Sequence, residues 1–160
     1  MNMKNINLRA IYKNKTQVMY IFSALFSILY TIFVYIFFRS FFIDSIEKIQ
    51  SARIDTALWA IFALVVLFPI IEEITDRLII WYVIEKLLGR MFSFFLVAVI
   101  WDAPHLMDST TKTIALIPMA FFLSYCRYKT DGIGLSLFTH IIYNFSISVI
   151  FYIPKINFLH

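Results

Sequence analysis

The feature that most constrains this chain is a stretch of 23 residues without Asp, Glu, Lys or Arg, from Thr16 to Phe38. A helix needs roughly 20 apolar residues to cross the ~30 Å hydrocarbon core of a bilayer, so this stretch is long enough to span one. A second stretch of the same length runs from Gly132 to Pro154. Helices of a soluble protein need a polar face toward water, which the first stretch lacks. The sequence therefore predicts an all-α fold, a polytopic transmembrane helical bundle.

Bulk composition agrees with a membrane protein. Of the 160 residues, 61% are hydrophobic and 15% are charged, whereas soluble domains average about 45–50% and about 25%. The first apolar stretch exceeds the core of a secretory signal, which runs to about 7–15 residues. The single cysteine, Cys126, can form no disulfide within the chain. The net charge of +4 flanks the apolar stretches, which indicates contact with anionic lipid and argues against binding to nucleic acid.

The other uncharged runs reach spanning length only if some polar residues lie inside the membrane. They are Thr56–Ile71, Leu78–Ile84, Met91–Trp101 and Thr113–Cys126. The pattern predicts about five to six helices: 17–40, a bent helix or helix pair over 56–68 and 70–89, then 91–106, 112–127 and 133–153. Pro69 predicts the bend, and Gly89-Arg90 predicts a helix end.

We expect a single membrane domain over residues 1–160. It divides into a basic N-terminal segment over 1–16, an anchor helix over 17–43 and a four-helix core over 56–153. Because Lys and Arg near membrane helices stay in the cytoplasm, the basic segment predicts a multi-pass protein of the cell membrane with a cytoplasmic N-terminus. The loop from Asp44 to Asp55 would then lie outside.

Several ionisable side chains fall in or beside the apolar runs, namely Glu72, Glu73, Asp76, Arg77, Asp102, His105 and His140. A charge at the centre of a membrane helix costs about 2.5–3.5 kcal/mol on insertion scales, so such residues indicate a functional site. Side chains four residues apart share a helix face, so Glu73 can pair with Arg77, and His140 points the same way as Asn144. Glu72 lies about 100° around the helix from Glu73 and remains as the free carboxylate.

This set of side chains fits hydrolysis of a peptide bond by water. A free carboxylate in an apolar site can serve as a general base, so we expect Glu72, with His105, to hold and deprotonate a water. His140 and Asn144 can donate hydrogen bonds to the carbonyl oxygen as it gains negative charge. Cys126 has no base placed to activate it, and no serine stands in a nucleophile motif.

The same residues resemble the three motifs of the CAAX protease and bacteriocin-processing (CPBP, or Abi) family, which are EExxxR, FxxxH and HxxxN/D. In this chain they read Glu72-Glu73-x-x-x-Arg77, Trp101-x-x-x-His105 and His140-x-x-x-Asn144. The resemblance covers about residues 56–153 and implies that these form the catalytic core of an intramembrane endopeptidase of glutamic or metallo type. It implies a peptide or membrane-protein substrate, in bacteriocin processing or self-immunity.

The resemblance also implies a role for each motif residue. Glu72 matches the catalytic glutamate, with Glu73 and Arg77 as its supporting pair. His105 matches the histidine that helps to activate water, and His140 and Asn144 match the residues that stabilise the oxyanion. Whether the family uses a metal is disputed, which leaves a divalent ion such as zinc open, with Glu72, His105 and His140 as ligands. No other cofactor is expected.

Five positions depart from the family pattern. Asp76 and Leu78 stand where an aromatic residue and a glycine are usual on either side of the arginine, Trp101 replaces the usual phenylalanine, and Asp102 and Pro104 lie within the second motif. Asp76 follows Glu72 by four residues, where like charges repel, and it can compete with Glu73 for the arginine.

These departures keep a second hypothesis open, a non-catalytic CPBP-like membrane scaffold or bacteriocin immunity protein that binds a partner. A proton-coupled transporter is disfavoured because the chain has no internal repeat. The expected partners are a peptide or membrane-protein substrate and the lipid bilayer, without nucleic acid, and no pattern predicts an oligomeric state.

Overall fold

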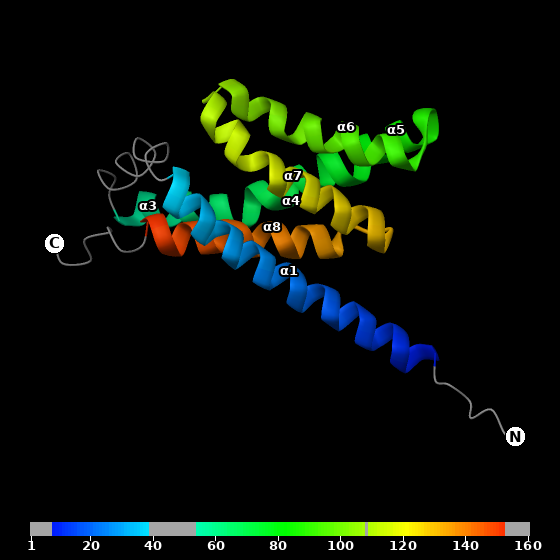
Figure 1. Cartoon of the computed structure of the whole chain (residues 1–160). Helices are drawn as coiled ribbons and strands as arrows, with labels where there is room; N and C mark the ends of the chain where they lie inside the picture. Colours follow the sequence, from blue (N-terminus) through cyan, green and yellow to red (C-terminus); the bar gives the residue numbers. More distant parts are fainter. Residues whose placement is uncertain (1–7, 39–53, 108, 153–160) are drawn as a thin grey trace, which may run out of the picture.

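The protein is a bundle of helices (Figure 1), as a computed structural model describes it for residues 8–38, 54–107 and 109–152. The α-helices are α1 (Leu8–Phe38), α3 (Ile54–Phe62), α4 (Phe68–Glu72), α5 (Trp81–Leu88), α6 (Arg90–Asp102), α7 (Thr110–Thr130) and α8 (Gly134–Ile147). Wider π-helical segments lie at Ala63–Leu67, Glu73–Ile80 and Ser148–Tyr152, and a 3₁₀ segment at Ala103–Met107. The part of the chain that the structure describes contains no strand, which confirms the predicted all-α bundle.

The predicted bent helix or helix pair is one continuous helix from α3 to α5, with α4 in its middle and two π-helical segments along it. The first of these segments is explained by Pro69. The Phe68 N–H donates to the carbonyl of Ala63, five residues back, and Pro69 has no N–H to donate. The carbonyl of Leu64 therefore receives neither the α-helical donor, since the Phe68 N–H bonds to Ala63, nor a π-helical donor, since Pro69 has none.

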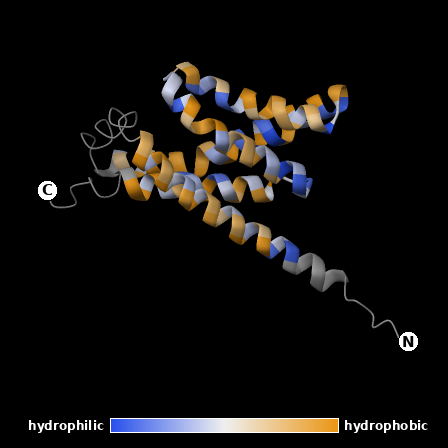
Figure 2. Cartoon of the chain, in the orientation of Figure 1, coloured by the Kyte–Doolittle hydropathy of each residue, from blue (hydrophilic) through white to orange (hydrophobic). Residues whose placement is uncertain are grey.

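Three helical stretches are long and apolar enough to cross a membrane, Lys15–Phe38, Thr56–Leu88 and Arg90–Met107, and Gly134–Ile150 is a shorter apolar helix. Large apolar side chains stay exposed on these helices, among them Leu29, Trp59 and Leu87. Figure 2 shows mostly hydrophobic residues along α1 beyond the hydrophilic turn near its N-terminal end. Such surfaces suit lipid rather than water, so the chain is a membrane protein.

α1 runs beside α8 in the same direction, as contacts of Tyr20 with Phe138 and of Tyr30 with Tyr143 show. Small hydroxyl side chains on the buried face of α1 let the two backbones approach closely. They are Ser23, Ser27 and Thr31. Ser27 Oγ lies 3.2 Å from the Thr139 carbonyl oxygen, to which it donates. The helix predicted as an anchor is thus also part of the packed bundle. It is described to Phe38, and residues 39–43 and most of the predicted outer loop lie outside the described residues.

Short connections fold the rest of the bundle. Gly89 joins α5 to α6 with a φ of 88°, a backbone conformation that favours glycine, and it ends the helix where the sequence predicts. α7 starts two residues before its predicted position, with Ser109 as its N-cap, and ends at Thr130. Asp131 follows in the left-handed conformation. α7 packs against α6 and α8, and the shared core includes Tyr30, Trp101, Leu116, Met119 and Tyr143.

Candidate functional site

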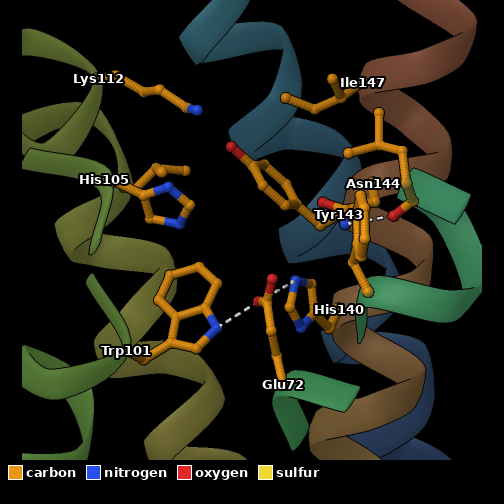
Figure 3. A pocket seen from close by; sticks show the side chains of 11 residues that line it. Glu72, Trp101, His105, Lys112, His140, Tyr143, Asn144 and Ile147 are labelled. Carbon is orange, nitrogen blue, oxygen red and sulfur yellow. Dashed lines mark hydrogen bonds and ion pairs between the residues drawn. The ribbon is translucent and has the colours of Figure 1, made fainter. Parts of the chain in front are cut away.

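A cavity of about 260 Å³ opens between the helix that contains α4, the end of α6, and helices α7 and α8 (Figure 3). Its walls contain four of the residues singled out in the sequence, Glu72, His105, His140 and Asn144. These four come from three separate stretches of the chain, and only the packing of the bundle brings them together. The remaining lining residues are Leu64, Phe68, Trp101, Lys112, Leu116, Tyr143 and Ile147.

The two neighbouring glutamates have opposite environments. The Glu72 side chain is 34% exposed and faces the cavity, whereas the Glu73 side chain is fully buried behind it. This matches the expectation that successive helical residues point in different directions. Glu72 is thus the carboxylate that a bound molecule can reach, and Glu73 is part of the supporting structure.

Glu72 is held by the indole of Trp101. The Nε1–H of Trp101 donates to Oε2 of Glu72 at 2.7 Å, and Nε2 of His140 lies 3.7 Å from the same oxygen. A hydrogen bond to an ionised acceptor is shorter and stronger than one between neutral groups. Trp101 itself is almost fully buried, so it offers the carboxylate a donor of fixed position. Glu72 Oε1 takes no part in this bond, so one oxygen of the carboxylate remains for a further contact.

His140 lies between the two glutamates. Its Nδ1 is 3.1 Å from Oε1 of Glu73, and its Nε2 faces Glu72 and the cavity. When Glu73 is ionised it accepts a hydrogen bond only, so the Nδ1 of His140 carries the proton in that bond. The contact therefore orients the imidazole ring and leaves Nε2 as the atom that meets a bound molecule.

Glu73 also pairs with Arg77, as the spacing predicts. Arg77 Nη1 lies 3.3 Å from Glu73 Oε1, and both side chains are fully buried. The guanidinium of Arg77 sits over the Trp101 ring, 5.0 Å from its centroid. Asp76 is nearly buried as well, but the close ion pair of the arginine is with Glu73. One buried network thus connects Arg77, Glu73 and His140 and supports the ring that holds Glu72.

The second motif does not stay α-helical to its end. α6 ends at Asp102, and His105 lies on the 3₁₀ segment that follows, because Pro104 lacks the N–H that an α-helix would need. The His105 ring still packs against Trp101, with centroids 5.5 Å apart, and lines the cavity. Asp102 does not line the cavity; it is buried, and its Oδ1 has no hydrogen-bond partner among the described residues.

Asn144 donates a hydrogen bond to the backbone of another helix, which the motif spacing does not predict. Its Nδ2 donates to the carbonyl oxygen of Leu64 at 2.9 Å, the carbonyl that Pro69 deprives of a backbone donor. The bond ties α8 to the π-helical segment of the facing helix. An amide has two N–H donors, so this bond leaves one Nδ2–H of Asn144 for another acceptor.

Three cavity residues have contacts or places that the motifs do not predict. Trp101 belongs to the second motif, but its hydrogen bond to Glu72 is not expected there, since the usual phenylalanine could not donate. Tyr143 lies three residues after His140, and the helical period places it on the same face. Lys112 falls in a polar connection in the sequence, and only the structure places it beside the cavity.

The residues that the structure describes contain no cluster of side chains that could bind zinc. Glu72, His105 and His140 all line the cavity, but no three His, Cys, Asp or Glu side chains in the described ranges approach closely enough to hold a metal ion. His140 uses Nδ1 for Glu73. We therefore assign no step of the chemistry to a metal.

A family model described as type II CAAX prenyl endopeptidase, Rce1-like, matches residues 53–146. The match covers more than half of the chain and includes all six motif residues from Glu72 to Asn144. No curated protein and no solved structure matches the chain significantly. The chain belongs to the Rce1-like family of type II CAAX prenyl endopeptidases.

Proposed function

We propose that this protein is an intramembrane endopeptidase in which Glu72 activates a water for attack on a peptide bond. The observation that supports this most is the position of the Glu72 carboxylate. It is fixed by Trp101 at 2.7 Å and opens onto a cavity that His105, His140 and Asn144 also line. A base, a second polar group and two donors around one space form the set that hydrolysis requires.

In the proposed reaction, Glu72 takes a proton from the water as the water oxygen bonds to the carbonyl carbon. His105, on the other side of the cavity, orients the water. The carbonyl oxygen, now negative, accepts hydrogen bonds from His140 and from the remaining Nδ2–H of Asn144. Glu72 then gives its proton to the amine nitrogen as the carbon–nitrogen bond breaks, which regenerates the carboxylate.

For His140 to donate from Nε2, its ring must carry protons on both nitrogens. Its position between Glu72 and Glu73 suits that state, because a carboxylate faces each nitrogen.

The substrate that we propose is a peptide or membrane-protein segment, and the expected setting is bacteriocin processing or self-immunity. The family takes its name from prenylated CAAX sequences, so a farnesylated peptide is the first substrate to try. We also propose a cytoplasmic N-terminus. The start of α6 and the end of α7 lie toward the end of the bundle where α1 begins (Figure 1). The basic residues of these helix ends include Arg90, Arg127 and Lys129, as expected if that end is cytoplasmic.

The direct test is cleavage by the purified full-length protein in lipid nanodiscs. A farnesylated CAAX peptide and its unlipidated counterpart are incubated with the protein in water enriched in oxygen-18, and products are identified by mass spectrometry. We expect cleavage with one heavy oxygen in the new carboxylate. Absence of cleavage with intact binding would favour the scaffold hypothesis instead.

Treatment with a metal chelator is expected to leave the cleavage rate unchanged. The reason is that the described residues offer no cluster of three ligands, while structural and catalytic zinc sites use at least three protein ligands. The measurement is the initial rate before and after dialysis against a chelator. A loss of rate that added zinc restores would contradict this expectation.

Trp101→Phe is expected to lower kcat about 10- to 100-fold, since a hydrogen bond to a charged group contributes about 1.5–3 kcal/mol. The change keeps an aromatic ring in the core but removes the donor to Glu72 together with part of the indole surface, so the loss should fall mainly on kcat and KM should stay near the wild-type value. Trp81→Phe is the matched control. It removes an equivalent indole bond, to Glu85 Oε2 at 2.8 Å, outside the cavity, and should leave kcat unchanged.

A further inference from the structure

A second, smaller cavity of about 180 Å³ lies between α1, α7 and the start of α8. None of the described residues that line it also lines the cavity of Glu72. Its floor contains the buried side chains of Ser23 and Cys126, and its rims are exposed, with Val18 and Phe22 on α1 and Tyr125 on α7. The cavity is therefore a groove on the outside of the bundle, which we call the α1–α7 groove.

The α1–α7 groove is open to the hydrocarbon of the bilayer. Its α1 wall belongs to the membrane-spanning stretch Lys15–Phe38. The polar groups at its floor have partners within the protein, because Cys126 Sγ lies 3.8 Å from Ser23 Oγ and 3.7 Å from Thr139 Oγ1. The bilayer core holds no water, so a hydrocarbon chain fills the groove and makes the dispersion contacts that a void would lose.

The two walls run antiparallel, which fixes what lies at each end of the groove. The rings of Phe26 and Phe122 stack with centroids 3.8 Å apart, and one turn closer to the start of α1, Ser23 meets Cys126. The next turn of α7 in the same direction brings Lys129 to the end of the groove. The Lys129 ammonium lies 5.5 Å from the centroid of the Tyr125 ring, which is part of the rim.

A second lysine lies at this end on the other wall. Lys15 precedes Val18 and Met19, which line the groove, by three and four residues and so shares their helix face. Lys15 and Lys129 are both exposed. The nearest acid along α7, Asp131, pairs with Arg90. The groove is thus apolar along its length and has two cations at one end, a distribution of charge that complements a lipid with an anionic headgroup.

We propose that the α1–α7 groove binds one anionic phospholipid, such as phosphatidylglycerol. One acyl chain lies between α1 and α7, and the headgroup phosphate lies between Lys15 and Lys129. The lysines are at the end of the bundle for which we propose a cytoplasmic position, and the cytoplasmic leaflet is the one that carries anionic lipid. This site is separate from peptide hydrolysis and does not depend on whether Glu72 is catalytic.

The test is photolabelling of the purified full-length protein in vesicles. The vesicles contain phosphatidylglycerol and phosphatidylcholine in equal amounts, and one of the two lipids carries a diazirine in its acyl chain. Labelled residues are identified by mass spectrometry. We expect phosphatidylglycerol to label Phe22 and Tyr125 about 30-fold more than phosphatidylcholine does, because each lysine near the headgroup adds about fivefold in affinity.

Variants of the two lysines test the headgroup site. Lys15→Gln and Lys129→Gln should each lower the preference for phosphatidylglycerol about fivefold, and the double variant should label equally with both lipids. Lys86→Gln is the matched control. Lys86 also lies over a tyrosine ring, that of Tyr82 at 4.5 Å, but on α5 and away from the groove, so this variant should label like the wild type.

Equal labelling of the wild-type groove by the two lipids, or a preference that survives in the double variant, would overturn the proposal. So would labels spread evenly over the exposed face of α1. If a farnesylated peptide displaced the lipid label, the groove would be a site for the lipid chain of a substrate and the proposal would be wrong. None of these results bears on cleavage, which the oxygen-18 experiment measures separately.

Discussion

Glu72→Gln is expected to lower the cleavage rate about 10²–10⁴-fold, the usual contribution of a general base, while the bundle remains folded. Glutamine has nearly the same shape and retains an oxygen that can accept the Trp101 hydrogen bond. What it loses is the capacity to take a proton from water. The measurement is kcat on the peptide that the wild-type protein cleaves best, together with the thermal unfolding of the purified variant.

Glu85→Gln is the matched control for that experiment. Glu85 lies on the same continuous helix and also accepts a tryptophan indole bond, from Trp81 at 2.8 Å. It does not line the cavity, so this variant should cleave like the wild type. If Glu72→Gln retained full activity, water activation by Glu72 would be wrong. If the Glu72→Gln protein then protected cells against a bacteriocin without cleaving the peptide, this result would support the scaffold hypothesis.

Glu73→Gln is expected to reduce stability rather than only the rate. The change leaves the Arg77 guanidinium fully buried without its charge partner, and breaking a buried pair in this way costs about 3–5 kcal/mol. His140 loses its Nδ1 partner at the same time. Thermal unfolding in nanodiscs should show a clear drop in Tm, far larger than that of Glu72→Gln next to it.

The double variant Glu73→Gln/Arg77→Met separates the contribution of Glu73 to stability from its contribution to activity. Replacing both charges of a buried pair with neutral groups is often close to neutral for stability, so most of the Tm should return. Activity should stay low, because nothing then orients the His140 ring. A Glu73→Gln protein as stable as the wild type would show that the buried pair does not hold the bundle together.

Much of the fold follows from local rules that the sequence contains. Uninterrupted apolar stretches such as Thr16–Phe38 must be helical in lipid, because every backbone polar group needs a partner within the segment. The pairing of Glu73 with Arg77 also follows from helical spacing, and it persists although Glu73 begins a π-helical segment. Gly89 likewise ends a helix by its own conformational preference.

The exact helix geometry around the site does not follow from those rules. Pro69 predicts a disturbance in its helix, but not that Leu64 would lose its backbone donor or that Asn144 would supply one. That bond joins residues 80 positions apart, and no periodic pattern reports a contact of this kind. The hydrogen bond between Trp101 and Glu72 is likewise not predicted by any periodic pattern, because the two residues come from different helices.

The sequence by itself determined that this chain is a membrane-embedded helical bundle, which of two adjacent glutamates is free, and which family it belongs to. These depend on helical period, apolar length and motif order, all of which are local along the chain. Only the tertiary structure decided that Glu72, His105, His140 and Asn144 share one cavity, that an indole holds the free carboxylate, and that Lys112 also lines this cavity. Those relations depend on how separate helices pack, because side chains far apart in sequence meet only when the backbones that carry them are brought together.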